Sequence, residues 1–166
     1  QSAMVALLEK NLERMPDRAK QTVGPIGHTP VISVDISEPT INAFRALYEH
    51  GLYAVPVVNK LNGNSIVANI SAKDVRIVCT TPAHLSLLHS PISQFLSVVH
   101  QQEIDICTPS ITVQPSDTLE KAIRTIIANR IHRVYVINPD NTIASVVSLT
   151  DILHQFVTEP DSGEGN

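Results

Sequence analysis

The stretch Ile131-His-Arg-Val-Tyr-Val-Ile-Asn138 decides the fold, together with the stretch Thr142-Ile-Ala-Ser-Val-Val-Ser-Leu-Thr-Asp-Ile-Leu153 that follows it. Each contains a run of β-branched and aliphatic residues, which predicts two largely buried strands. The residues between the runs include asparagine, proline and aspartate, which are typical of a turn. The two stretches therefore predict a strand, a turn and a second strand.

Ser148 and Asp151 indicate where the second strand ends and a helix begins. A hydroxyl followed three residues later by a carboxylate is the pattern with which many helices are capped. His132 and Arg133 place cationic side chains at the start of the first strand, while Asp151 places an acid after the second. These charged residues are the first candidates for a functional site.

The composition indicates a globular chain with an aliphatic core. Its 166 residues suffice for one domain or two small ones, and 43% of them are apolar although only 4% are aromatic. The formal net charge of −4 argues against a surface for nucleic acid or anionic membranes. No apolar run is long enough to span a bilayer.

The cysteines and histidines do not predict a disulfide framework or a metal site. Cys79 and Cys107 show no metal-type spacing, and we expect free, buried thiols in a reducing compartment, either cytoplasmic or nuclear. His84 and His89 are five residues apart and have no cysteine or acid to complete a ligand set. No nucleophile motif, Walker loop or Gly-rich dinucleotide turn is present, so we predict no enzyme activity, no metal and no cofactor.

The strand–turn–strand–helix pattern occurs twice along the chain. We predict a leading helix and linker over residues 1–27, a first repeat over 28–83, connecting helices over 84–105, a second repeat over 106–158 and a disordered tail over 159–166. In each repeat a short strand and a helix come first. Ser37-Glu-Pro-Thr40 and Gln114-Pro-Ser-Asp117 are expected to cap these helices.

The two repeats also match residue by residue, which favours duplication over chance. Up to the turn the offset is 79 residues, and after the turn it is 77, so the first turn is two residues longer. Two copies of a unit too small to bury its own sheet are expected to pack about a pseudo-two-fold axis. The matched pairs are Ser37/Ser116, Ala43/Ala122, Arg45/Arg124, Val55/Val134, Val57/Val136, Asn59/Asn138, Ile66/Ile143, Ser71/Ser148 and Asp74/Asp151.

This duplicated unit, which ends in Ser-x-x-Asp, resembles the cystathionine-β-synthase (CBS) domain, of which a tandem pair forms a Bateman module. The chain is most similar to the regulatory γ subunit of AMP-activated protein kinase. His132-Arg-Val-Tyr-Val-Ile-Asn138 with Ser145-Val-Val-Ser-Leu-Thr-Asp151 resembles the last repeat of that family. Val55-Pro-Val-Val-Asn59 with Asn69-Ile-Ser-Ala-Lys-Asp74 resembles its third. The resemblance implies an α+β fold with two three-stranded sheets packed with helices.

The resemblance also implies two clefts that bind adenine nucleotides. A carboxylate offers acceptors to the vicinal hydroxyls of a ribose, and a guanidinium binds phosphate through a forked contact. One cleft would use Asp74, Ser71 and Lys73 together with His132, Arg133, Pro109, Ile111 and Ile131. The other would use Asp151, Ser148 and Thr150 together with Ile32, Leu52 and Tyr53.

The chain departs from the family pattern in two places, and the first departure predicts unequal clefts. The first repeat has Tyr53-Ala54 where the second has His132-Arg133, so the Asp151 cleft lacks a local phosphate pair. Ala68 and Ser145 also replace a usual glycine, although both are small.

Simpler interpretations of the same residues remain open. Ser-x-x-Asp is often only a helix cap, and a strand histidine, a surface arginine or a helix lysine often has no ligand.

We therefore predict a regulatory module for energy sensing and kinase regulation, which binds AMP, ADP or ATP and signals occupancy to a partner protein or an attached domain. The expected partners are an adenine nucleotide, a second copy or another CBS module, and a protein kinase, but neither nucleic acid nor a membrane. The alternative is a ligand-free CBS module that serves only for interaction or dimerisation.

Overall fold

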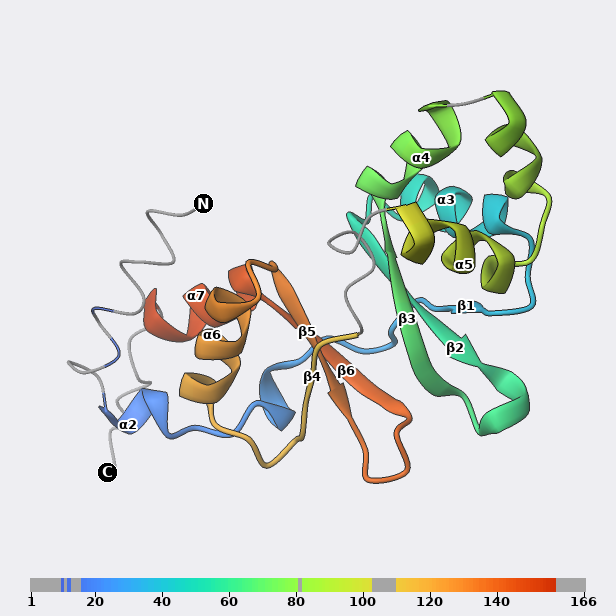
Figure 1. The fold of residues 1–166 in the computed structure, drawn as a ribbon. Helices are drawn as coiled ribbons and strands as arrows, with labels where there is room; N and C mark the ends of the chain where they lie inside the picture. Colours follow the sequence, from blue (N-terminus) through green and yellow to red (C-terminus); the bar gives the residue numbers. More distant parts are fainter. Residues whose placement is uncertain (1–9, 11, 13–15, 81, 103–109, 158–166) are drawn as a thin grey trace, which may run out of the picture. The chain divides into compact units, whose positions relative to one another are not determined.

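The computed structural model describes residues 10, 12, 16–80, 82–102 and 110–157, and these form two compact units (Figure 1). Unit 1 takes the described residues of Gln1–Pro30, Ile111–Pro139 and Ala144–Asn166, and unit 2 takes those of Val31–Ser110 and Asp140–Ile143. The predicted leading helix lies outside the described residues except for residues 10 and 12, and the predicted acidic tail lies outside them entirely.

Unit 2 contains the first predicted repeat and the connecting helices. Its three-stranded sheet has the order β1-β2-β3, with β1 parallel to β2 and β2 antiparallel to β3. The elements are β1 (Val34–Asp35), α3 (Thr40–Glu49), β2 (Ala54–Asn59), η2 (Lys60–Asn62), β3 (Ser65–Ser71), η3 (Ala72–Asp74), α4 (Val75–Thr80), η4 (Pro82–Leu88) and α5 (Ile92–Gln102).

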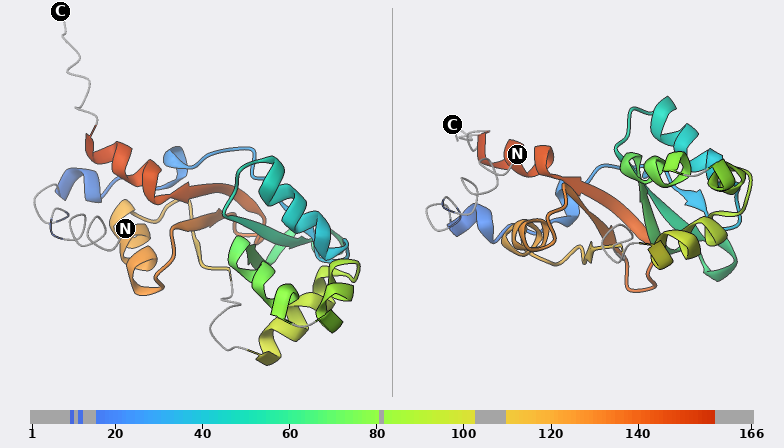
Figure 2. Two further views of the ribbon diagram at one scale, coloured as in Figure 1. Left: turned by 90° about the horizontal axis from the view of Figure 1, so that it is seen from above. Right: turned by 45° about the horizontal axis from the view of Figure 1, so that its top comes forward.

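Unit 1 contains the second predicted repeat, and its three-stranded sheet has the order β4-β5-β6 with β4 parallel to β5. Its elements are α2 (Pro16–Ala19), η1 (Gly24–Ile26), β4 (Thr112–Val113), α6 (Leu119–Ala128), β5 (Arg133–Ile137), β6 (Ile143–Ser148) and α7 (Leu149–Val157). In Figure 2, η3 and α4 follow directly from β3, and α7 follows directly from β6. The predicted α+β fold with two three-stranded sheets is therefore confirmed.

Each unit has its own aliphatic core, as the low aromatic content predicts. Val55, Val57 and Ile70 of the unit 2 sheet pack with α3 and α5, where Phe44 and Phe95 make an edge-to-face contact at 5.9 Å between ring centroids. In unit 1 the strands pack with α6 and α7 through Val134, Val136, Val147, Ile123, Ile126 and Ile152. No helix within the described ranges is long and apolar enough to cross a membrane.

The same backbone hydrogen bonds occur within each unit, between residues related by the offsets found in the sequence. Ala72 N–H donates to Tyr53 O at 2.9 Å where the last helix of unit 2 begins. At the equivalent place in unit 1, Leu149 N–H donates to His132 O at 2.9 Å. The duplication therefore extends to the way each strand pair joins the following helix. Further equivalent pairs are Leu52–Leu47 and Ile131–Ile126, His50–Ala46 and Asn129–Thr125, and the strand partners Val34–Val57 and Val113–Val136.

Residues 16–30 precede β1 in sequence but belong to unit 1, with the elements of the second repeat, so residues 28–30 lie outside the unit that holds the rest of the predicted first repeat. Val23 N–H donates to Asp117 O at 2.9 Å, and the Val23 side chain is fully buried in the unit 1 core. His28 then pairs with Val146 of β6 as an antiparallel bridge, through hydrogen bonds of 2.9 and 3.2 Å. This bridge fixes His28 beside the strand that leads into α7.

Gly27 lets this segment approach β6 closely. A Cβ added at Gly27 would lie 2.0 Å from Ser145 Oγ and 2.6 Å from Ser145 Cβ, which is far inside van der Waals contact. Val147 Cγ2, the next atom, would lie at an ordinary 3.4 Å. Space, and not a left-handed backbone, is therefore the reason for glycine here.

Three sequence predictions are wrong in detail. The cap of α6 is Thr118, whose side chain accepts the Lys121 N–H, and not a residue of the predicted Gln114-Pro-Ser-Asp117. Cys79 is exposed, not buried, because Ile77 and Val78 are the residues of α4 that face the core. Cys107 lies outside the described residues. The predicted cap at Ser37 is also absent, because the Ser37 hydroxyl donates to the Asp35 carboxylate and no side chain caps α3.

Gly27→Ala is expected to lower the free energy of unfolding by about 1–3 kcal/mol, the usual cost of inserting a methyl group into a packed site. Ser145→Gly in the same chain should restore most of this loss because it removes both clashing atoms. Urea denaturation of the two single variants and the double variant measures the coupling. Additive effects of the two substitutions would show that the close approach is not the cause.

Candidate functional site

Asp74 is the central residue of the candidate site in unit 2. β3 ends at Ser71, and η3 places Asp74 in the first turn after the strand. Ser71 N–H donates to Asp74 Oδ2 at 2.7 Å, and the Ser71 side chain accepts the Asp74 N–H to complete a capping box. The sequence pattern therefore forms the cap that it predicts.

The second carboxylate oxygen of Asp74 has no partner. The residue is 4% exposed, and Oδ1 is shielded from water without a hydrogen bond to any described residue. A buried acceptor without a partner is costly, so such groups often mark a functional site. Burial raises the pKa of Asp74 above its ordinary value of 3.8, against the lowering effect of its hydrogen bonds to Ser71.

The other residues of unit 2 that were predicted to bind the ligand differ in how far their side chains are exposed. Ile32 and Leu52 are half-buried against the unit 2 core, so each leaves part of an apolar surface uncovered. Lys73 is exposed. Tyr53 is 79% exposed, and its carbonyl is held by Ala72.

Asp151 is the equivalent residue of unit 1, and it makes more contacts than Asp74. Its Oδ2 accepts Ser148 N–H at 2.8 Å and the Ser148 hydroxyl at 2.6 Å. Its Oδ1 lies 2.6 Å from His28 Nε2. Both oxygens of this buried carboxylate are therefore occupied, while Thr150 beside it is exposed.

Sequence reasoning missed His28 because it treated that histidine as one of several scattered ones. No spacing rule joins residues 123 positions apart, so only the fold could show that His28 meets Asp151.

The predicted phosphate pair also lies in unit 1. Arg133 begins β5, and His132 directly precedes it with its carbonyl bound to Leu149 of α7. Ile111 and Ile131 are half-buried against the unit 1 core, which leaves part of each exposed. Pro109 lies outside the described residues.

The structure thus groups the predicted residues into two half-sites, each within one unit. We call Ser71, Lys73 and Asp74 of unit 2 the Asp74 half-site, and Ser148, Thr150 and Asp151 of unit 1 the Asp151 half-site. The partners predicted for each carboxylate lie in the other unit, so their pairing across the units stays a prediction.

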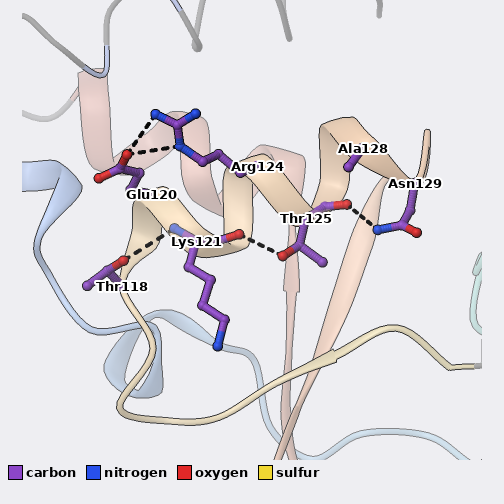
Figure 3. Close-up of a pocket in the computed structure, with 7 residues that line it drawn as sticks. All are labelled: Thr118, Glu120, Lys121, Arg124, Thr125, Ala128 and Asn129. Carbon is purple, nitrogen blue, oxygen red and sulfur yellow. Dashed lines mark hydrogen bonds and ion pairs between the residues drawn. The ribbon is translucent and has the colours of Figure 1, made fainter.

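A separate hollow lies along the outer surface of α6 (Figure 3). All its lining residues come from this helix and its ends, and no predicted site residue is among them. Its cations already pair along the helix, Lys121 with Asp117 at 2.7 Å and Arg124 with Glu120 at 2.8 Å. This hollow is therefore a solvated helix surface. Within the described ranges, no three His, Cys, Asp or Glu residues are grouped as metal ligands would be.

Comparison with known proteins agrees with the duplication. The model of the CBS domain family matches residues 23–79 and 103–158. The chain belongs to the CBS domain family, as a tandem pair. The SNF1-related protein kinase regulatory subunit gamma-1-like of Arabidopsis thaliana is 32% identical over 134 residues, which is 78% of this chain and 30% of that protein.

Two solved structures show the same fold. Protein MJ1225 from Methanocaldococcus jannaschii, described as a putative archaeal homolog of g-AMPK, aligns with a TM-score of 0.72 at 15% identity over 92% of this chain and 53% of its own. CBSX2, solved in complex with AMP, aligns with a TM-score of 0.58 at 18% identity over 80% of this chain and 93% of its own.

Asp74→Asn should change how stability depends on pH. Because the pKa of Asp74 is raised by folding, its contribution to stability is present below about pH 3.8 and is lost as the pH rises through the raised pKa. The variant cannot lose this contribution, so its free energy of unfolding should increase relative to wild type between about pH 4 and pH 7.

Urea denaturation across this pH range measures the difference. Asp140→Asn is the matched control, because hydrogen bonds from Thr142 lower the pKa of Asp140 and predict the opposite sign. A pH-independent difference for Asp74→Asn would contradict the raised pKa.

Proposed function

We propose that this chain is a non-catalytic regulatory module that binds an adenine nucleotide (AMP, ADP or ATP) and signals its occupancy to a partner protein or an attached domain. The ligand would favour one arrangement of the two repeats, and only such differential affinity can do regulatory work. The chain spans 30% of the length of the curated relative described above, so a kinase as the partner is part of the proposal.

The unpartnered Oδ1 of Asp74 carries this proposal. The two vicinal hydroxyls of a ribose are neighbouring donors, and the two oxygens of a carboxylate can accept one hydrogen bond from each of them. Oδ2 retains a lone pair beside its bond from Ser71, and Oδ1 has both of its lone pairs available. Because Oδ1 is shielded in this structure, the ligand must displace the atoms that cover it.

The remaining predicted residues supply what a nucleotide needs beyond its ribose. Ile111 and Ile131 expose apolar surface suited to an adenine ring. Arg133 provides a cationic donor suited to a phosphate, and His132 beside it provides a further hydrogen-bonding group. The relation of these groups to Asp74 is part of the proposal, because they belong to the other unit.

A ligand-free interaction module is the second candidate, and exposed apolar residues favour it. Tyr48 is 88% exposed and Leu61 is 98% exposed, both on unit 2. Such residues suit contact with a second copy, another CBS module or a kinase. This function is compatible with nucleotide binding, but on its own it predicts that nucleotides have no effect.

Thermal melting with AMP, ADP, ATP and S-adenosylmethionine distinguishes the two candidates. A nucleotide at a hundredfold excess over its dissociation constant should raise stability by about 2.7 kcal/mol, because it binds only the folded state. A shift with an adenine nucleotide supports the regulatory module. No shift with any of these ligands favours the interaction module, and turnover of a nucleotide would contradict both.

Asp74→Ala should weaken AMP binding more than Asp151→Ala does, since Asp74 has the available oxygen and the phosphate pair is predicted on its side. Loss of a charged acceptor costs about 1.5–3 kcal/mol, or roughly ten- to hundredfold in affinity. Isothermal titration calorimetry of the two variants measures the difference. Equal losses would contradict the predicted inequality.

Arg133→Ala should weaken AMP far more than adenosine, because only AMP has a phosphate for the guanidinium to bind. Arg124→Ala is the matched control, since Arg124 lies on the outer surface of α6 and pairs with Glu120. Titration of each variant with both ligands gives the ratio of affinities. Equal weakening of AMP and adenosine by Arg133→Ala would exclude a phosphate role.

A further inference from the structure

The two half-sites differ in what already binds their carboxylates. Asp74 Oδ1 has no hydrogen bond to the part of the chain that is described, whereas Asp151 Oδ1 lies 2.6 Å from His28 Nε2. Asp151 Oδ2 is bound by both the N–H and the hydroxyl of Ser148. A ribose could therefore not bind Asp151 as proposed for Asp74 unless His28 moved.

The backbone holds His28 in place while its side chain stays accessible. The antiparallel bridge to Val146, with Gly27 against Ser145, fixes the main chain beside β6. The imidazole itself is 73% exposed, whereas the Asp151 side chain is 10% exposed. The imidazole thus covers a buried carboxylate from the solvent side and can rotate away without opening the core.

The interaction is suited to displacement. A hydrogen bond to a side chain that is open to water contributes little to stability, because water competes for the exposed group. The carboxylate would remain capped by Ser148 after His28 left, so only one of its oxygens would need a new partner. A ribose hydroxyl can supply that partner.

We propose that His28 blocks the Asp151 half-site, so that nucleotide binds there only by displacing the imidazole. This inference rests on the proposed function and adds regulation to it. The Asp74 half-site then fills at lower nucleotide concentration than the Asp151 half-site, and the module responds over two concentration ranges.

The repeat alignment shows why only one half-site would have this block. At the offset of 79, His28 corresponds to Cys107 (28 + 79 = 107). A thiol is a weak donor, whereas an imidazole nitrogen is a strong hydrogen-bonding group. Duplication has therefore left different side chains at the position that precedes each first strand.

The test uses chains that carry Asp74→Ala, which removes the ribose acceptor of the Asp74 half-site, so that binding reports on the Asp151 half-site. Adding His28→Ala should tighten adenosine binding by about two- to fivefold, the range expected from removing one hydrogen bond whose imidazole partner is exposed to water. His28→Gln should stay close to the chain with intact His28, because its amide can still donate to the carboxylate. His89→Ala is the matched control, since His89 is an exposed histidine of unit 2.

Isothermal titration calorimetry with adenosine and AMP measures the affinity of the Asp74 variant alone, of the same variant with each of the three histidine substitutions, and of wild type. Unchanged or weaker binding in His28→Ala, while wild type binds at the Asp74 half-site, overturns the block and leaves the proposed function intact. No binding by any chain, His28→Ala included, overturns both. Binding that appears only when His28 is removed supports the block.

Discussion

The structure depends on an aspartate buried at the point where a strand becomes a helix. Asp74 and Asp151 each accept the N–H of a serine three residues earlier, and this bond fixes the turn that joins the sheet to its last helix. The cap satisfies one oxygen of each carboxylate. The other oxygen can accept a ligand only if no side chain already binds it. Whether it has such a partner therefore decides if the aspartate only caps the helix or can also bind a nucleotide.

Duplication supplies this arrangement twice, and later divergence makes the copies different. The backbone bonds Ala72–Tyr53 and Leu149–His132 are equivalent, so both repeats build the same frame. The side chains on that frame are not equivalent. Asp74 has an oxygen without a partner among the described residues, whereas the segment before β1 places His28 on Asp151. Two half-sites of one design can then differ in affinity.

Much of the fold could be predicted because its signals are local and occur twice. The strands, the helices and the Ser-x-x-Asp caps follow from periodicity and from residue types a few positions apart. Other features depend on distant contacts that no pattern contains. The pairing of His28 with Asp151 is one, and the exposure of Cys79 on α4 is another. The cap predicted at Ser37 failed for a local reason, because Ser37 bonds to Asp35 two residues away and not to the helix. The candidate carboxylates could be predicted, but which oxygen is available could not.

The most direct test of the central claim compares adenosine with 2′,3′-dideoxyadenosine, which keeps the base and lacks the two ribose hydroxyls. Titration of the wild-type chain should show binding of adenosine and a loss of about tenfold or more for the dideoxy compound, because the carboxylate then receives no donor. This loss should be much smaller in Asp74→Ala. Equal affinity of wild type for both compounds would contradict the account.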